Sequence, residues 1–385
     1  RKIMRFYLRE GFVTVALSWI LMSVIGCLPF VINGDIPHFA DALFEMISGF
    51  TTTGATVVSD VEGLTKGSLF WRSFSHWIGG MGVLVFLLAI VPMAGGSHMN
   101  LMKAESPGPS VGKLVPKVRQ TAKYLYIIYF ALTMIEVIFL LFGGMNLFEA
   151  LTTSFGTAGT GGFAIWNDGF VSVSPYNQWV VTIFMLLFGV NFGFYFLILT
   201  GKLRDALKFE EVRIYFIIVI AAAVFIFINL RHFALYAPAE GIRQAFFQVA
   251  SIITTTGFAS ADFNLWPETS RTILVLLMFI GACAGSTGGG IKVSRFIIAC
   301  KSFIKEIISY LHPRSVKKIK IEGKPLEHET LRATNVYFMT YMVIFAVSVL
   351  LVSIENKDLV TNFAAVAATF NNIGPGLSLV GPMAN

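Results

Sequence analysis

Four short segments of the sequence end in a run of threonine, asparagine or glycine residues that can offer oxygen ligands to a cation. The clearest copy ends in Thr51, Thr52, Thr53 and Gly54, after about ten helix-compatible residues. Main-chain carbonyls and hydroxyls of this kind can replace the water around a dehydrated cation. Glycine is needed where the chain turns through backbone angles that a β-carbon forbids. The four copies together therefore predict an oxygen-lined cation site.

The predicted filter is the last four residues of each copy: Thr51, Thr52, Thr53 and Gly54; Gly159, Thr160, Gly161 and Gly162; Thr254, Thr255, Thr256 and Gly257; Asn371, Asn372, Ile373 and Gly374. The expected ion contacts are Thr52, Thr53, Thr160, Gly161, Thr255, Thr256, Asn372 and Ile373. No carboxylate adjoins the four glycines, which favours a weakly hydrated monovalent ion over calcium or magnesium. Because the copies differ in sequence, we expect only approximate fourfold symmetry and looser selectivity than in a symmetric tetramer.

The composition is that of a membrane protein. Hydrophobic residues make up 55% of the 385 residues and charged residues 13%, whereas a soluble domain has about a quarter charged residues. The mean hydropathy is +0.73. The three cysteines are scattered, with no CxxC pair and no histidine cluster, so neither a disulfide framework nor a zinc site is indicated.

Seven stretches approach the roughly 20 apolar residues that a helix needs to cross a bilayer. They are residues 12–31, 70–93, 124–142, 179–199, 212–230, 272–283 continuing after a break to about 309, and 333–353. One glycine-ending segment lies between the two spans of each pair, and the fourth follows the last span. This order predicts an all-α integral membrane protein with four tandem helix–pore-loop–helix repeats in pseudo-fourfold arrangement around a central pore.

The repeats are expected at residues 1–95, 96–201, 202–310 and 311–385. The third has a broken second helix, and the fourth begins with a basic cytoplasmic linker and lacks its second helix in this chain. Most of the 29 lysines and arginines lie at residues 1–9, 95–123, 201–213 and 292–332. The positive-inside rule then places the N-terminus in the cytoplasm, so that all four glycine-ending segments enter from outside. The net charge of +7 is therefore a topology signal and does not suggest nucleic-acid binding.

The sixth span is interrupted by a glycine-rich run between residues 281 and 290. Each glycine costs roughly 1 kcal/mol relative to alanine inside a helix, so we expect the helix to unwind there, at mid-membrane. The alternative is a close crossing of helices lined by small residues. A phosphate-binding loop is excluded, because no Gly-Lys-Ser/Thr follows.

The chain is similar to the Trk/Ktr family of potassium-translocating subunits, the TrkH and KtrB group within the superfamily of potassium transporters. The resemblance covers essentially the whole chain. It is carried by the four filter copies and by Trp77-Ile-Gly-Gly-Met-Gly82, Ala104-Glu-Ser-Pro-Gly-Pro109, Gly285-Ser-Thr-Gly-Gly-Gly-Ile-Lys292 and Asn371-Asn-Ile-Gly-Pro-Gly376.

The resemblance implies that one subunit folds its four repeats around its own pore and that potassium binds in the filter. The glycine-rich run would be an intramembrane gate below the filter, formed by Gly285, Ser286, Thr287, Gly288, Gly289, Gly290 and Lys292, with Arg295 helping to hold it. The family also implies a homodimer in the bacterial plasma (inner) membrane, in contact with lipid and docked on a cytoplasmic regulatory ring of the TrkA/KtrA type. A nucleotide (ATP/ADP or NAD/NADH) would bind only to that ring, and no covalently bound cofactor is expected.

Some features depart from the family or stay open. The family ends in a further helix with an arginine below the filter, which is not found in this chain, and the start at Arg1 leaves both the TrkH and the KtrB branch possible. His76 and Glu136 lie within spans and are either functional groups or buried structural contacts. The basic stretch 311–332 would either dock a partner or lie against anionic lipid.

Potassium translocation through a gated, channel-like pore is the function that these features favour. A sodium-coupled or sodium-conducting relative is the nearest alternative. A carrier with inverted repeats needs matching broken helices in two halves, whereas the sequence indicates a break in the sixth span alone. An enzyme is disfavoured, because the sequence shows no paired carboxylates, HExxH motif or nucleophile–base cluster.

Overall fold

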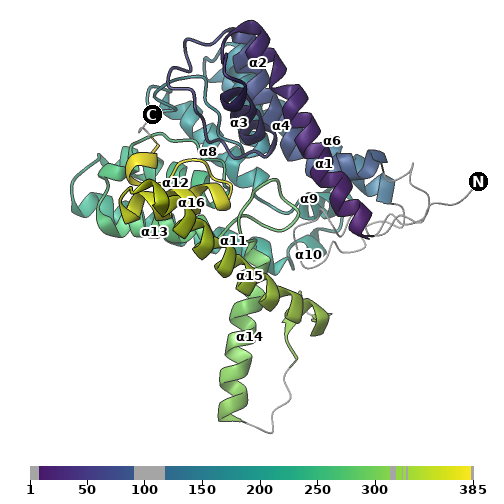
Figure 1. Cartoon of the computed structure of the whole chain (residues 1–385). Coiled ribbons are helices and arrows are strands. Elements are labelled where there is room, and N and C mark those ends of the chain that lie inside the picture. The colour runs from purple at the N-terminus through teal and green to yellow at the C-terminus, as the bar shows by residue number, and fades with distance from the viewer. Residues whose placement is uncertain (1–7, 91–117, 313–317, 323, 327, 383–385) are drawn as a thin grey trace, which may run out of the picture.

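The computed structural model describes residues 8–90, 118–312, 318–322, 324–326 and 328–382, and it is almost entirely helical (Figure 1). The motif at 104–109 lies outside the described residues. In chain order, the first quarter contains α1 (Leu8–Gly26), α2 (Leu28–Asn33), α3 (Phe39–Phe50) and α4 (Lys66–Ile90). The second contains α6 (Val118–Phe142), α7 (Leu147–Gly159), α8 (Pro175–Phe188), α9 (Phe192–Leu199) and α10 (Leu203–Ala206).

The third quarter contains α11 (Glu210–His232), α12 (Pro238–Ile253), the 3₁₀ turn η2 (Phe263–Leu265), α13 (Glu268–Phe279) and α14 (Val293–Leu311). The fourth contains β1 (Lys320–Ile321), β2 (Lys324–Pro325), α15 (His328–Val352), η3 (Ser353–Glu355), α16 (Leu359–Phe370) and η4 (Ser378–Val380). The two short strands pair antiparallel in a hairpin.

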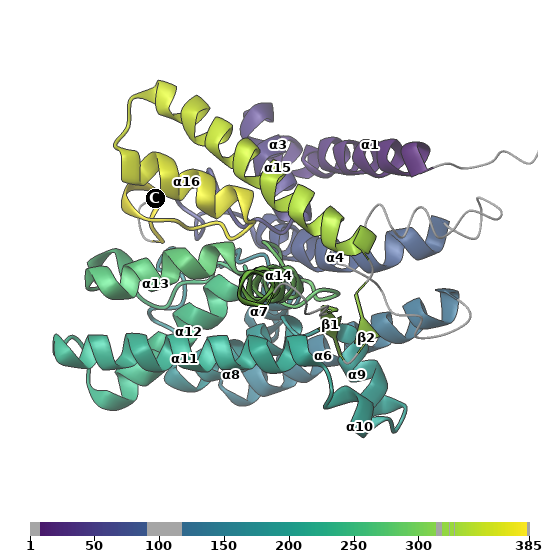
Figure 2. The ribbon, with the colours of Figure 1, turned by 90° about the horizontal axis from the view of Figure 1, so that it is seen from below.

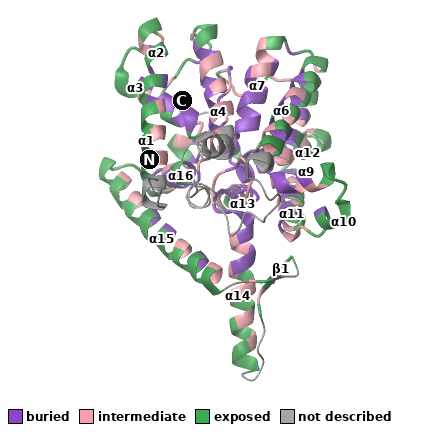
Figure 3. Cartoon of the chain, turned by 90° about the vertical axis from the view of Figure 1, so that its right-hand side faces the viewer, coloured by how far each residue is buried: buried purple, intermediate pink, exposed green. Residues whose placement is uncertain are grey.

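The helices form two layers. The helices α3, α7, α12 and α16, which precede the glycine-ending segments, each pack against two or three others: α3 against α1 and α4, α7 against α4, α6 and α8, α12 against α11, α8 and α13, and α16 against α15 and α13. Figure 3 shows buried residues concentrated around α4 and α7, and exposed residues along α15 and α10. The four short helices therefore form the inner layer, and their C-terminal ends lie inside the molecule.

Four helices of the described chain are long and apolar enough to cross a membrane, at Val13–Asn33, Lys123–Phe142, Glu210–His232 and His328–Glu355. They agree with the predicted spans 12–31, 124–142, 212–230 and 333–353. The predicted span 70–93 corresponds to α4 as far as Ile90. Residues 91–93 lie outside the described part of the chain.

The fourth predicted span differs from the expectation. Residues 179–199 do not form one continuous helix, because α8 and α9 are bent by 88° at a short break. A β-carbon at Gly189 in this break would meet the Tyr215 hydroxyl oxygen at 2.5 Å and the Thr254 methyl group at 2.8 Å. The close approach of α11 and α12 therefore explains why a glycine interrupts the helix here, and the expectation that only the sixth span is broken is wrong.

The sixth predicted span is broken as expected, but its second half takes a different course. Residues 280–292 are non-helical, which rules out a continuous helix crossing lined by small residues. Helix α14 is seen end-on in Figure 2, where α11, α13 and α15 run across the view, and in Figure 1 it projects away from the body. It therefore does not complete a span parallel to its neighbours.

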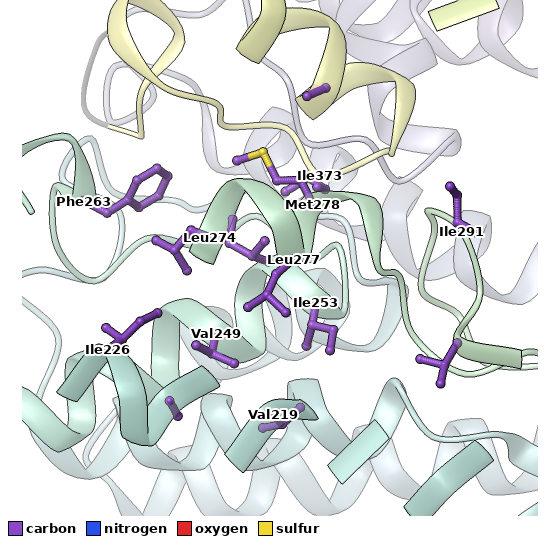
Figure 4. Close-up of a cluster of buried hydrophobic side chains, with 14 of the residues drawn as sticks. Val219, Ile226, Val249, Ile253, Phe263, Leu274, Leu277, Met278, Ile291 and Ile373 are labelled. Atoms are coloured by element: carbon purple, nitrogen blue, oxygen red, sulfur yellow. The ribbon is translucent and has the colours of Figure 1, made fainter. Parts of the chain in front are cut away.

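The largest apolar core joins the third and fourth quarters (Figure 4). Side chains of α11, α12 and α13, including Ile226, Ile253 and Leu277, pack there with Met278 and Ile373. Full burial of an aliphatic side chain stabilises a fold by about 1.5–3 kcal/mol. This core therefore fixes the glycine-ending segment at Ile373 against the helices of the third quarter.

Candidate ion-binding site

The four short helices begin with different capping arrangements. Helix α7 starts with a capping box, in which the Asn146 side chain accepts from Glu149 N and the Glu149 carboxylate accepts from Asn146 N. At α16 the Asp358 carboxylate accepts from Thr361 N at 3.0 Å. At α12, Pro238 occupies the first turn, where a missing N–H costs nothing.

All four short helices end in the same backbone turn, which we call the glycine turn (residues 51–54, 159–162, 254–257 and 371–374). The residue two before the glycine has a left-handed φ of 52–63° in every copy, at Thr52, Thr160, Thr255 and Asn372. The final glycine has φ of 77–99°. The amide between them donates back to the helix at 2.8–2.9 Å in each copy. Sequence differences between the copies therefore leave the backbone geometry unchanged.

The glycine turns meet in a closed ring of contacts. A β-carbon at each glycine would collide with a main-chain carbonyl oxygen of another turn: Gly54 faces Gly161, Gly162 faces Thr256, Gly257 faces Ile373, and Gly374 faces Thr53. Each contact thus joins one turn to the next in chain order, and the last turn to the first. Glycine is required here by both the backbone angle and the close approach.

A cavity of about 350 Å³ lies on one side of this ring and is lined by all four glycines. The residue after each glycine also lines it: Ala55, Phe163, Phe258 and Pro375. The cavity is therefore on the side toward which the chain leaves the glycine turns. Asp60 lies near its rim, where hydrogen bonds from the Asn167 side chain and Gly63 N hold the pKa of the Asp60 carboxyl below its ordinary value. This carboxylate stays negative at neutral pH, and its neighbours Ser59 and Val61 line the cavity.

His76 links the first two glycine turns from behind. Its Nδ1 lies 2.8 Å from Gly49 O, near the end of α3, and its Nε2 lies 3.2 Å from Phe163 N. The amide must donate to Nε2, so Nδ1 carries the proton in the neutral ring. A β-carbon at Gly161 would also collide with the imidazole. The structure therefore supports the structural interpretation of His76.

A buried ion pair supports the first glycine turn. Arg72 Nε donates to Glu45 Oε1 at 2.7 Å, and both side chains are almost fully buried. The same carboxylate accepts from Thr56 Oγ1 and from Val57 N, and the Arg72 guanidinium lies 4.2 Å from the centre of the Phe163 ring. A buried pair of this kind is costly to break, because one charge would be left unpaired.

The predicted filter side chains fall into distinct environments. Thr51 Oγ1 and Thr254 Oγ1 donate to carbonyls of their own helices at 2.6 Å, and each lies 2.8 Å from a second threonine hydroxyl. The Ile373 side chain is fully buried in the apolar core, so its main-chain carbonyl alone can face an ion. Main-chain oxygens are therefore the ligands that all four turns can offer.

The non-helical segment 280–292, which we call the break loop, lies against the opposite side of the ring from the cavity. Gly289 N donates to Thr255 Oγ1 at 2.6 Å, in the third glycine turn. A β-carbon at Gly288 would meet Thr254 O at 2.9 Å, and one at Gly289 would meet Asn371 O at 3.1 Å. The structure thus places the predicted gate residues directly beneath the predicted filter.

Buried charges hold the break loop in place. Glu211 Oε1, at the start of α11, accepts from Ala284 N at 2.7 Å and from Ser294 N at 2.9 Å, so that one carboxylate ties both ends of the glycine-rich run. The Lys292 ammonium donates to Gly288 O within the loop. Arg295 lies 3.9 Å from the centre of the Tyr337 ring and so connects α14 to α15.

Sequence analysis missed three of these groups. Glu211 resembles an ordinary acid in the first turn of a helix, where it complements the helix dipole. Asn191 caps α9 by accepting from Gly193 N at 2.8 Å. Because Asn191 lies within an apolar run, the sequence does not indicate the bend between α8 and α9. Glu45 is buried and paired, unlike a solvated loop acid. Glu136 is fully buried in α6, where the Thr157 side chain of α7 lies near its carboxylate.

The chain is similar to known proteins over almost its whole length. Residues 1–382 match a family model, TrkH, described as a cation transport protein. The chain is 38% identical over 383 residues to the Trk system potassium uptake protein TrkH of Escherichia coli K12, covering 97% of this chain and 78% of that protein. It is 33% identical over 375 residues to the potassium uptake protein TrkG of the same strain, covering 96% and 77%.

The crystal structure of the potassium transporter TrkH from Vibrio parahaemolyticus superimposes with a TM-score of 0.86 at 34% identity, covering all of this chain and 79% of the other. This agreement identifies the fold as that of a mostly helical, multi-pass membrane protein with homology to bacterial TrkH. It also confirms the expectation of a transporter in place of an enzyme. The chain belongs to the TrkH family of cation transport proteins.

Proposed function

We propose that the chain takes up potassium ions through a pore formed by its own four repeats in pseudo-fourfold arrangement. The observation that carries this proposal is the closed ring of glycine turns between a cavity and the break loop. The ring brings main-chain carbonyls of four segments together at one level, and the cavity gives access to it from one side. Four sets of neutral oxygens suit a weakly hydrated monovalent cation.

The break loop acts as the gate in this proposal. It lies on the far side of the ring from the cavity, in contact with the third and fourth glycine turns. Its buried Lys292 ammonium places a positive charge on that side, where it opposes the passage of a cation. Opening requires the loop to leave Thr255 and the Glu211 carboxylate, and both contacts are short hydrogen bonds that a regulatory movement can exchange.

The cavity faces the outside of a bacterial inner membrane. The segment around the short helix α10 contains the basic residues Lys202, Arg204 and Lys208. The positive-inside rule assigns such a cluster to the cytoplasm. The chain passes from there through α11 to the start of α12, so α12 enters the membrane from the outside. The basic residues of segment 1–9 place the N-terminus in the cytoplasm by the same rule.

A second copy of the chain and a cytoplasmic nucleotide-binding ring complete the assembly. Helix α14 projects from the body with large apolar side chains exposed, including Phe303 (68%) and Tyr310 (86%). An exposed apolar stripe of this kind marks an interaction surface. The second copy of the chain covers the apolar stripe of α14. The cytoplasmic ring belongs to the other components of a Trk system, because the E. coli relative is named as part of such a system.

Replacing Gly257 with serine tests the pore. Its φ of +84° costs a residue with a β-carbon about 1–2 kcal/mol, and the β-carbon would collide with Ile373 O in the ring. We expect potassium uptake to fall by about tenfold or more, with weaker selectivity over sodium in purified protein reconstituted into vesicles.

Gly144→Ser is the matched control. Gly144 has a φ of +86°, but nothing lies within 4 Å of the position of its β-carbon. The two substitutions therefore share the backbone strain and differ in contact with the ring. Equal uptake and equal selectivity in the two variants would refute the pore. Uptake that requires sodium on the same side would favour the sodium-coupled alternative.

A further inference from the structure

The side chain of Asn372 reaches across the ring from the fourth glycine turn to the first. Its Nδ2 donates to Thr51 O at 2.9 Å, to Thr52 O at 3.1 Å and to Thr52 Oγ1 at 3.2 Å. Its Oδ1 accepts from Thr53 Oγ1 at 2.6 Å. One amide group is therefore bonded to three consecutive residues of another glycine turn.

The equivalent residues of the other turns behave differently. All four have the same left-handed backbone angle, so their side chains leave the turns at the same level. Thr160 Oγ1 donates to Gly159 O in its own turn, and Thr255 Oγ1 accepts from Gly289 N of the break loop. Within the described residues, Asn372 alone at this level donates to main-chain carbonyls of a different glycine turn.

An amide nitrogen surrounded by three oxygens competes with a cation for the same ligands. Each N–H uses a carbonyl lone pair, and its partial positive charge is unfavourable beside a bound cation. Thr51 occupies the same place in its turn as Thr254 and Asn371, whose carbonyl oxygens face Gly288 and Gly289 of the break loop. At this inner level the ring therefore offers fewer free oxygens than its four backbones would allow.

We propose that Asn372 is a specificity-determining residue, whose amide occupies the Thr51 and Thr52 carbonyls at the inner end of the filter and so limits the preference for potassium over sodium. The proposal rests on the pore described above. A filter selects potassium by the number and field strength of its oxygens. If the two carbonyls are freed from the amide, more oxygens can coordinate potassium, which loses its hydration water more easily than sodium does.

Asn372→Thr is the sharpest test, because it gives the fourth turn the residue found at this level in the other three. Threonine already adopts the required φ at Thr52, Thr160 and Thr255, so the backbone accepts it. We expect the ratio of potassium to sodium flux in vesicles to rise by about three- to tenfold, which corresponds to the net free energy of one hydrogen bond. An unchanged or lower ratio in folded protein overturns the proposal.

Thr53→Val provides a second route to the same result. It removes the hydroxyl that orients the Asn372 amide, and we expect a smaller rise in the ratio. Thr53→Val decides the question if Asn372→Thr protein does not reach the membrane, and an unchanged ratio in Thr53→Val then overturns the proposal.

Asn264→Thr is the control variant. Asn264 also joins two repeats, since it accepts from Ser378 N at 3.0 Å and donates to Ser378 O at 3.3 Å, but it lies outside the glycine turns. We expect its flux ratio to equal that of the unchanged protein. The Gly257→Ser variant distinguishes failure of the Asn372 proposal from failure of the proposed pore. If it alters selectivity while Asn372→Thr does not, only the role of Asn372 fails; if neither does, the pore fails as well.

Discussion

The second and third repeats both interrupt the helix that follows the glycine turn, and the two interruptions have different consequences. In the second repeat the break is short, and α9 resumes at once after a bend of 88°. In the third repeat the break runs over residues 280–292, and the chain passes beneath the ring before α14 begins. A short interruption redirects a helix, whereas a long one supplies a segment that reaches the ring of glycine turns.

The two breaks also hold each other. Cys283 N donates to Gly189 O at 3.0 Å, and Phe192 N donates to Gly285 O at 3.0 Å. Backbone groups freed by each interruption therefore find partners in the other one, as required for non-helical backbone at membrane depth. The neck of the break loop is closed separately, by Gly281 N donating to Ile291 O at 2.7 Å. The middle of the loop, residues 284–289, lies inside this closed neck.

Removing that middle part should have the largest effect. We expect deletion of residues 284–289 to raise potassium flux by about tenfold or more, because a gate whose open state is populated a few per cent of the time limits conduction. Rubidium flux into vesicles that contain the purified protein measures this. Flux equal to that of the unchanged protein, with intact folding by thermal unfolding, would remove the gating role.

Loosening the loop without shortening it should have an intermediate effect. In Glu211→Ala, the amides of Ala284 and Ser294 lose their shared acceptor, and each unpaired buried donor costs about 1–3 kcal/mol. We expect a lower unfolding temperature and a several-fold higher flux than in the unchanged protein. The neighbouring Glu210→Ala serves as control, since the partly exposed pair of Glu210 with Lys301 is worth about 0–1 kcal/mol. A rise in flux in Glu210→Ala as large as in Glu211→Ala would contradict the assignment.

The break in the second repeat should show the smallest effect. Asn191→Ala removes the cap of α9, which costs about 1 kcal/mol of stability. The Asn191 side chain lies beside Gly285 of the break loop, but its hydrogen bond is to Gly193 N within α9. We therefore expect the flux to stay unchanged while the unfolding temperature falls slightly. A flux increase comparable to that of the loop deletion would show that both breaks gate the pore.

The parts of the molecule that depend on local sequence could be predicted. The ends of the four short helices coincide with the predicted segments, and the glycine-rich run unwinds where its helix propensity is lowest. The family resemblance is confirmed by the match over residues 1–382. The assignment of individual filter and gate residues stays a prediction.

Features that depend on tertiary contacts could not be predicted. The bend at Gly189 arises from contacts with Tyr215 and Thr254, which lie far away in the sequence. Hydropathy indicates how long an apolar helix is but not the direction in which it runs. No feature of the sequence therefore predicts that α14 crosses its neighbours. The role of Glu211 likewise depends on two amides more than 70 residues away.

The contact between Gly374 and Thr53 has a consequence for how the protein is made. The first and last turns of the ring are about as far apart along the chain as the sequence permits, and no peptide link joins their repeats directly. During synthesis, the first three turns enter the membrane with their carbonyls facing an open side. Closure of the ring of glycine turns is therefore a late event, which awaits insertion of α16. Any truncation before that helix leaves three quarters of the ring with no closing partner.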